Sequence, residues 1–177
     1  LVRSPYFTAL RTEQQLGYVV AAANGRQHKT PGLVFIVQSP VADPASLVRA
    51  SEELIQQFGS TVEAMTPAEF EKHRSALVSL INRPHKNLYS KAGYFWAQIR
   101  QDYQRFDRRE QLTQALERVK LVQWQAFYRD NFLPVPRRAL VVTQAGAQKP
   151  APGAWGDMPV LSNVARFKQA HPQQAYP

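Results

Sequence analysis

The hydrophobic positions near the start of the chain follow a strand pattern. Residues 18–23 and 33–38 are rich in β-branched, aromatic and small apolar side chains, which predicts two strands. Turn-forming residues at both ends of the segment between them predict an antiparallel hairpin. The run Leu33–Val37 is continuously apolar rather than alternating, so we expect the second strand to be covered on both faces.

After Pro40 the apolar side chains recur every three or four residues, which predicts a series of helices. Asp43-Pro44 marks the start of the first helix, and Thr66-Pro67-Ala68-Glu69 is a capping box that begins the second. Arg83-Pro84 ends the second helix. Three more are predicted: about Leu88 to Tyr103, after Asp107, and around Trp124 to Phe132. The side chains expected to face inward include Phe70, Leu77, Leu80 and Ile81 in the second helix, and Leu88, Ala92, Phe95, Trp96, Ile99 and Tyr103 in the third.

The last part of the chain is expected to contain a strand and a tail. Pro134-Val135-Pro136 interrupts the helical pattern, Arg138 to Thr143 predicts a final strand, and a short helix is expected around Asn163 to Lys168. The order of elements predicts an α+β fold, in which several helices pack on one face of a mostly antiparallel sheet. We expect residues 1–145 to form a domain truncated at its start, followed by a proline-rich linker and tail over 146–177.

Composition limits the partners of this 177-residue chain. Lys and Arg outnumber Asp and Glu by 22 to 13, so the surface field is positive and favours anionic partners. No helix-turn-helix or RNA-binding motif accompanies this charge, so we do not expect a nucleic-acid partner. Cysteine is absent, which excludes disulfides and thiolate metal sites. No apolar run approaches the roughly 20 residues of a membrane span.

The localisation stays open between bacterial cytoplasm and periplasm. The N-terminal residues Leu1 to Pro5 have neither the charged region nor the apolar region of a signal peptide. Without an initiator methionine, the chain is expected to be part of a longer polypeptide, whose targeting these residues do not indicate.

Candidate chemistry lies between residues 10 and 20. This stretch is predicted to end a helix, break at Gly17 and open the first strand, so that Arg11 and Tyr18 flank a helix-to-strand junction. Seven positions interrupted by a turn can place both side chains in one cleft, where they could hold a carbonyl oxygen or an oxyanion. The alternative is that Tyr18 packs on the sheet, Arg11 pairs with Glu13 or another carboxylate, and Gly17 is a helix cap that needs a positive φ.

These residues also carry a family resemblance. Arg11 followed by Gln14-Gln15-Leu16-Gly17-Tyr18 resembles a signature in the C-terminal half of the pitrilysin and insulin-degrading-enzyme family of zinc peptidases, the inverzincins. The resemblance implies the fold of a mitochondrial-processing-peptidase-like metallohydrolase domain. One member type to which the chain is similar is coenzyme PQQ synthesis protein F.

The zinc-binding motif of that family is absent from this chain. The motif is His-x-x-Glu-His with a distant Glu, which together provide three ligands and leave one position open for water. None of the histidines at positions 28, 73, 85 and 171 fits this spacing. We therefore expect no metal site here, zinc in the N-terminal half of the parent, and no peptidase activity from this fragment alone. His73 is interpreted as a core or interface imidazole.

The resemblance implies a supporting role across the active-site cleft. Arg11 and Tyr18 would hydrogen-bond the carbonyl of the scissile peptide bound by the N-terminal half, and the domain would help to enclose the substrate chamber. The Leu33–Ser39 strand edge could also accept an extended peptide, and the basic region of Arg105, Arg108, Arg109, Lys86 and Lys91 could form a chamber wall or a solvated surface. The alternative function is an interaction or scaffold domain in a non-peptidase relative, and His-x-x-Glu-His upstream would decide between the two.

Overall fold

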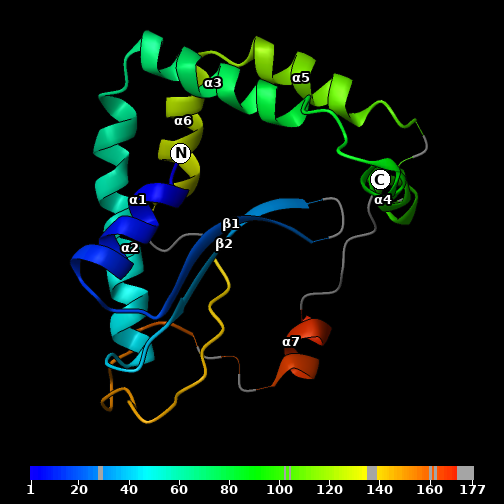
Figure 1. Cartoon of the computed structure of the whole chain (residues 1–177). Helices are drawn as coiled ribbons and strands as arrows, with labels where there is room; N and C mark the ends of the chain where they lie inside the picture. Colours follow the sequence, from blue (N-terminus) through cyan, green and yellow to red (C-terminus); the bar gives the residue numbers. More distant parts are fainter. Residues whose placement is uncertain are drawn as a thin grey trace.

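A computed structural model describes residues 1–27, 30–101, 103, 105–134, 139–159, 161 and 163–170. Two helical turns precede a hairpin of two strands, and further helices follow (Figure 1). In chain order the elements are α1 (Arg3–Phe7), the π-helical turn η1 (Thr8–Glu13), β1 (Val19–Gln27), β2 (Thr30–Gln38), α2 (Pro44–Glu63), α3 (Pro67–Ile81), α4 (Leu88–Arg100), α5 (Arg108–Arg118), α6 (Leu121–Phe132) and α7 (Val164–Ala170).

The predicted hairpin is confirmed, and its strands are longer than expected. β1 and β2 pair antiparallel, with Val20 opposite Val37 and Ala22 opposite Phe35. These residues share one face, on which Val20 and Ala22 are buried against α1 and α2. The expectation that β2 is covered on both faces is wrong within this chain, because Val34 and Ile36 on the other face are 43% and 49% exposed. A continuous apolar run does not specify which neighbour covers each face.

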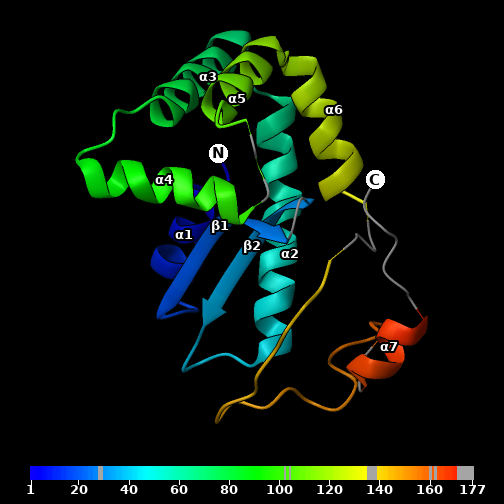
Figure 2. The ribbon, with the colours of Figure 1, turned by 90° about the vertical axis from the view of Figure 1, so that its right-hand side faces the viewer.

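The core lies along α2, the long helix that stands behind the hairpin in Figure 2. One buried cluster joins Tyr6 and Leu10 to the inner face of the hairpin, and a second joins Ile55, Phe58 and Val62 of α2 to α6. Two phenols tie these clusters to α2 by hydrogen bonds of 2.8 Å. The Tyr6 hydroxyl bonds the Ser51 hydroxyl, and the Tyr128 hydroxyl donates to the Ile55 carbonyl. α2 therefore connects the N-terminal junction with the helical region.

The N-terminal signals of the first two predicted helices are confirmed. The Asp43 carboxylate accepts hydrogen bonds from the Ala45 and Ser46 amides at the start of α2. Thr66 and Glu69 form the expected capping box at the start of α3.

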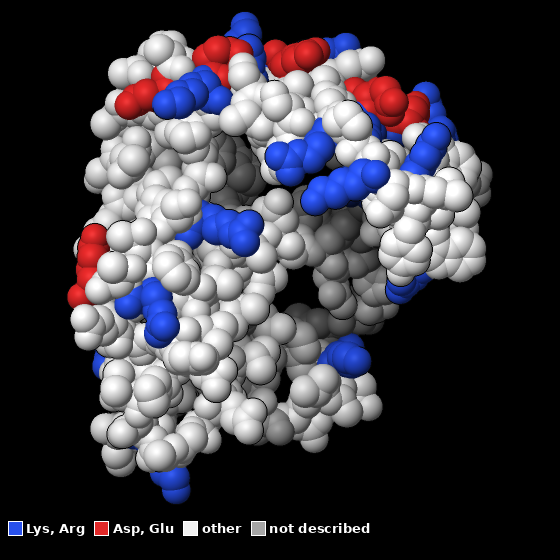
Figure 3. Space-filling view, in the orientation of Figure 1, with Lys and Arg blue, Asp and Glu red and all other residues white. Residues whose placement is uncertain are grey.

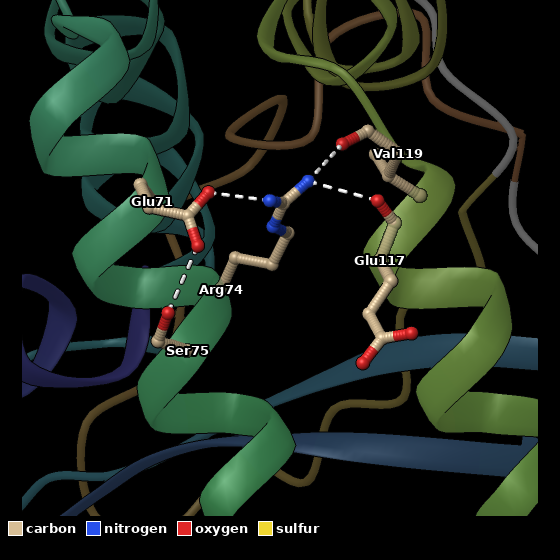
Figure 4. A network of polar contacts seen from close by, with 5 residues as sticks. All are labelled: Glu71, Arg74, Ser75, Glu117 and Val119. Carbon is tan, nitrogen blue, oxygen red and sulfur yellow. Dashed lines mark hydrogen bonds and ion pairs between the residues drawn. The ribbon is translucent and has the colours of Figure 1, made fainter.

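Helices α3 and α5 form an arm above α2 (Figure 1), and Arg74 of α3 is one of the residues that join them. The Arg74 guanidinium donates to the Glu117 and Val119 carbonyls at the end of α5 and forms an ion pair with Glu71, which also accepts from Ser75 (Figure 4). Phe70 and Ile81 are half-buried as expected. The inward placement of Leu77 and Leu80 is wrong, because they are 42% and 60% exposed. His73 is also exposed, so its interpretation as a core imidazole is wrong within this chain.

Helix α4 is present, and it buries only part of the face predicted, since Phe95 is half-buried as expected. The partly or fully covered residues of this helix are Ser90, Tyr94, Phe95 and Gln98. The inward placement of Leu88, Trp96 and Ile99 is wrong, because they are 81%, 61% and 52% exposed, and Ala92 is exposed as well. The helix ends at Arg100, so Tyr103 lies beyond it, although Tyr103 is half-buried as expected.

The predicted final strand is not formed. Residues 139–143 have no regular secondary structure, and Arg138, the first residue of the predicted strand, lies outside the described residues. Other predictions also fall on residues outside the described ranges: Val135 and Pro136 of the predicted interruption, His28 and Lys29 of the hairpin turn, and residues 171–177 of the tail. The sheet of the described chain therefore has two strands, and the fold is mostly helical with one antiparallel hairpin. The remaining predicted helices are confirmed as α5, α6 and α7, while the boundary between residues 145 and 146 stays a prediction.

Candidate functional site

The backbone between α1 and β1 contains two unusual conformations. Residues Thr8–Glu13 form a π-helical turn, closed by a hydrogen bond of 2.9 Å from the Gln14 amide to the Ala9 carbonyl. Gln15 then adopts a φ of 51°, in the left-handed region that non-glycine residues rarely occupy. The Leu16 amide next donates to the Leu10 carbonyl at 2.9 Å. The wide turn and the reversal at Gln15 return the chain toward η1 before β1 begins.

This return brings Arg11 and Tyr18 together. The Arg11 guanidinium carbon lies 5.2 Å from the centroid of the Tyr18 ring, a cation–π contact. An Nη1 hydrogen of Arg11 donates to the Gly17 carbonyl at 2.8 Å, which fixes the guanidinium above the junction. Tyr18 is 72% exposed while Arg11 is half-buried. The junction therefore presents one phenol and one positioned cation on the same side of the molecule.

The alternative contacts expected for these residues are not those observed. Among the described residues, Arg11 contacts Gly17 and Tyr18 and makes no ion pair with Glu13. Tyr18 does not pack on the sheet, since most of its side chain is exposed. Its backbone is nevertheless part of the hairpin base, because its amide donates to the Gln38 carbonyl at 2.7 Å.

Gly17 has a different role from the one expected. The left-handed residue of the turn is Gln15, and Gly17 does not have a positive φ. Gly17 is buried, and a Cβ atom there would lie 2.8 Å from Val20 Cγ2, 2.9 Å from Val37 Cγ1 and 3.2 Å from the Gln38 carbonyl oxygen. Glycine is needed here because the backbone passes very close to the sheet. The sequence motif includes Gly17 and so drew attention to it. No feature of the sequence indicated that Gln38 belongs to the site.

The described residues do not provide a metal site. They contain no group of three or more His, Asp or Glu side chains placed to hold an ion, and the full sequence has no cysteine. Within the part of the chain that the structure describes, the donor set therefore does not fit zinc.

The basic region at the start of α5 is engaged with its own surroundings. Arg109 lies over the Tyr94 ring at 4.6 Å from its centroid, and Arg108 lies 5.8 Å from that of Tyr103. Arg105 forms an ion pair of 3.2 Å with Asp107. These contacts favour a structural role for the three arginines. Figure 3 shows Lys and Arg side chains around the hollow below the helical arm, with Asp and Glu gathered along the outer edge.

His85 adjoins this basic region and contacts the Tyr94 ring, with centroids 5.1 Å apart. Loss of solvation lowers the pKa of His85, and the nearby charges of Arg109 and Lys91 lower it further. The imidazole is thus held in its neutral form to a lower pH than an isolated histidine.

Comparison with known protein families gives a match over more than half of the chain. The model for the PQQ synthase PqqF-like C-terminal lobe, domain 4, matches residues 1–96, which include the Arg11–Tyr18 junction, the hairpin and helices α2 and α3. The matched region thus contains all the residues of the candidate site.

Individual proteins show the same relationship. The chain is 29% identical over 145 residues to insulin-degrading enzyme-like 1, peroxisomal, of Arabidopsis thaliana, covering 80% of this chain and 15% of that protein. It is 33% identical over 109 residues to human insulin-degrading enzyme, covering 61% of this chain and 10% of the enzyme. Another relative, from Schizosaccharomyces pombe, is named a putative zinc protease.

The fold has a counterpart among solved structures. The crystal structure of pitrilysin superposes with a TM-score of 0.66 and 20% sequence identity, over 81% of this chain and 17% of that one. The chain thus spans between a tenth and about a sixth of the lengths of these proteins. Among the described helices, none has the length and apolar character needed to cross a membrane.

Proposed function

Because this chain belongs to the pitrilysin and insulin-degrading-enzyme family, as its PqqF-like C-terminal lobe domain, we propose that it acts as a non-catalytic part of a larger zinc endopeptidase. In this proposal the metal and its ligands belong to another part of the parent polypeptide. This domain helps to enclose the peptide substrate and supplies Arg11 and Tyr18 to the reacting bond. The parent degrades or processes peptides.

The observation that carries the proposal is the paired presentation of Arg11 and Tyr18. A peptide carbonyl gains negative charge on its oxygen when a nucleophile attacks, and positioned donors stabilise that charge. The Tyr18 hydroxyl can donate one hydrogen bond, and a guanidinium carries five N–H donors, of which one is used on Gly17. The contact with Arg11 also limits the orientations of an otherwise exposed phenol.

The backbone attachments of Arg11 and Tyr18 support the proposal that the two side chains are held in fixed positions. The Gly17 carbonyl that holds Arg11 is on a buried residue, and the Tyr18 amide is bonded to β2 through Gln38. Both functional groups are therefore attached to the packed base of the hairpin. Catalysis benefits from donors that are already in place when charge develops, because no reorganisation is then needed.

The test is peptide hydrolysis by the full-length parent carrying Tyr18→Phe or Arg11→Ala. Removal of one donor to an oxyanion costs about 10²-fold in kcat in other acyl-transfer enzymes, and we expect a loss of that order for Tyr18→Phe. The zinc content of each variant should equal that of the wild type, since neither residue is proposed to be a ligand. The 177-residue chain alone should hydrolyse no peptide.

Matched controls separate site chemistry from general effects of substitution. Tyr89 on α4 is 88% exposed, and Tyr89→Phe removes the same hydroxyl at a distant position. Arg100, exposed at the end of α4, serves in the same way for Arg11→Ala. The assignment fails if Tyr18→Phe and Arg11→Ala both retain the kcat of their controls.

A further inference from the structure

Gln15 has a backbone conformation that suits glycine better than glutamine. Its φ of 51° lies in the left-handed region, at the position just after a helical turn where glycine is the usual residue. The neighbours of Gln15 impose this conformation, because the Gln14 and Leu16 amides both bond carbonyls of η1 and Leu16 packs against the buried cluster around Leu10. Glycine would adopt the same conformation without strain.

The contacts of the Gln15 side chain do not explain why glutamine is present. The side chain is exposed and makes no hydrogen bond to another described residue. Glutamine here therefore costs stability and gains no compensating polar contact within the described part of the chain. Non-glycine residues held in the left-handed region cluster at active sites and ligand-binding sites. The carboxamide of Gln15 is thus available to a group outside the described chain.

The position of Gln15 places its carboxamide beside the candidate site. Gln15 lies in the turn that returns the chain from Arg11 to Tyr18. Tyr18 follows Gln15 after two intervening residues, so the Cα atoms of these two residues lie within about 11 Å of each other. An extended peptide advances about 3.3 Å per residue. A peptide whose reacting carbonyl lies at Tyr18 can therefore meet Gln15 within about three residues of the reacting bond.

We propose that Gln15 is a substrate-binding residue whose carboxamide hydrogen-bonds the main chain of the peptide near the reacting bond. The carboxamide carries a carbonyl acceptor and an NH₂ donor. A peptide offers the complementary groups, an N–H donor and a carbonyl acceptor, at every residue other than proline. The contact therefore recognises extended peptide backbone and not a particular side chain. This inference rests on the proposed function, because it takes the peptide to be held at Arg11 and Tyr18.

Two substitutions of Gln15 separate substrate binding from backbone strain. Gln15→Gly and Gln15→Ala both remove the carboxamide, but only glycine relieves the left-handed backbone. In the full-length parent both should lower kcat/KM for peptide hydrolysis by about three- to tenfold, the equivalent of one hydrogen bond. In urea unfolding of the 177-residue chain, the folding equilibrium constant of Gln15→Gly should be about fivefold above that of Gln15→Ala. Gln15→Gly thus loses activity without the loss of stability that a purely structural role would require.

Replacement of single amides by esters in the peptide substrate tests whether the contact is direct. Each peptide of the series carries one ester in place of an N–H group within about three residues of the reacting bond, which itself remains an amide. At one position the ester should lower kcat/KM of the wild-type parent by about three- to tenfold and leave that of Gln15→Gly nearly unchanged. Gln114→Ala removes an exposed carboxamide on α5 and should respond to the series as the wild type does.

The outcomes distinguish this inference from the proposed function. An unchanged or raised kcat/KM in Gln15→Gly would overturn the binding role of Gln15, and so would an ester series to which the wild type and Gln15→Gly respond alike. If Tyr18→Phe still lowers kcat in that case, the proposed function stands without a contact from Gln15. If instead Tyr18→Phe and Arg11→Ala keep full kcat while Gln15→Gly lowers kcat/KM and loses the ester response, the role of the pair fails and the contact of Gln15 with the peptide is supported.

Discussion

The substitution Gly17→Ala tests whether the candidate junction depends on close backbone packing. Gly17 lacks a positive φ, so alanine meets no backbone strain there. The added methyl group would instead lie 2.8 Å from Val20 Cγ2 and 2.9 Å from Val37 Cγ1, closer than nonbonded carbon atoms approach. It would also lie 3.2 Å from the oxygen of Gln38, the residue that accepts the Tyr18 amide hydrogen bond.

The expected change in the free energy of unfolding follows from two opposing effects. Inserting a methyl group into a packed site costs about 1–3 kcal/mol, because neighbouring side chains must leave their preferred rotamers. Replacing glycine also restricts the unfolded chain, which returns about 0.4–1 kcal/mol. Both crowded side chains are β-branched, with a restricted χ1 angle, and Val20 is 6% exposed, so relaxation is limited. We expect the free energy of unfolding to fall by about 1–2 kcal/mol.

Urea unfolding followed by circular dichroism measures this change, with Gly93→Ala as the matched control. Gly93 lies inside α4, and a Cβ atom there meets nothing within 4 Å apart from its chain neighbours and the nearby backbone of the same helix. Alanine should stabilise that position by about 0.5–1 kcal/mol, since glycine is unfavourable inside helices. Adding Val37→Ala to Gly17→Ala should recover part of the loss, because it removes one of the two crowded methyl groups. A Gly17→Ala variant as stable as wild type would refute the packing argument.

Two further predictions concern the supports of α2 and α3. Tyr6→Phe should lower the free energy of unfolding by about 0.5–1.5 kcal/mol through loss of the 2.8 Å hydrogen bond to Ser51, and a double-mutant cycle with Ser51→Ala should yield a coupling in urea unfolding. Hydrogen bonds from Ser46 lower the pKa of Asp43 below 3.8, and those from Thr66 lower the pKa of Glu69 below 4.5. Because these folded-state pKa values are depressed, the stability they add is present above about pH 5 and is lost as the pH falls through them. Asp43→Asn with Glu69→Gln keeps both caps and should flatten the acid limb of a stability-against-pH curve, whereas an unchanged limb would contradict this origin.

The helix starts were predictable because their signals are local. Asp43 accepts hydrogen bonds from the first amides of α2, and Thr66 with Glu69 forms both bonds of a capping box. Each depends on residues within three positions of one another, so the sequence carries the whole interaction. The two strands were predictable for a similar reason, since apolar runs and a nearby turn define a hairpin.

The buried faces were less predictable because they depend on partners remote in sequence. In α4 the sequence favoured Trp96 and Ile99 as inward residues, but the helix covers Tyr94 and Gln98 instead. A stripe of apolar residues shows that a helix can be covered and does not identify what covers it. The same limit applies to residues 139–143, whose strand propensity is local and whose pairing is not.

The candidate site was predictable in its members and only partly in its geometry. Spacing allowed Arg11 and Tyr18 to meet, and the structure brings them into contact. The backbone conformations that bring these two residues together were not apparent from the sequence. Neither the π-helical turn nor the left-handed conformation of Gln15 is marked by a glycine or another residue type that would indicate it. π-helical turns occur often at functional sites, where they alter the direction of a side chain within a helix.

The junction separates function from stability between two adjacent residues. Tyr18 directs its ring into solvent while its amide is bonded to β2, so Tyr18→Phe removes an exposed hydroxyl and leaves every packed contact of the hairpin base in place. Gly17 is buried and holds Arg11 through its carbonyl, so its enlargement disturbs packing and the position of the cation together. If the pair supports catalysis in the parent peptidase, Tyr18→Phe must lower kcat at unchanged stability, and Gly17→Ala must lower both. Loss of stability without loss of kcat in Gly17→Ala would indicate that the junction is structural alone.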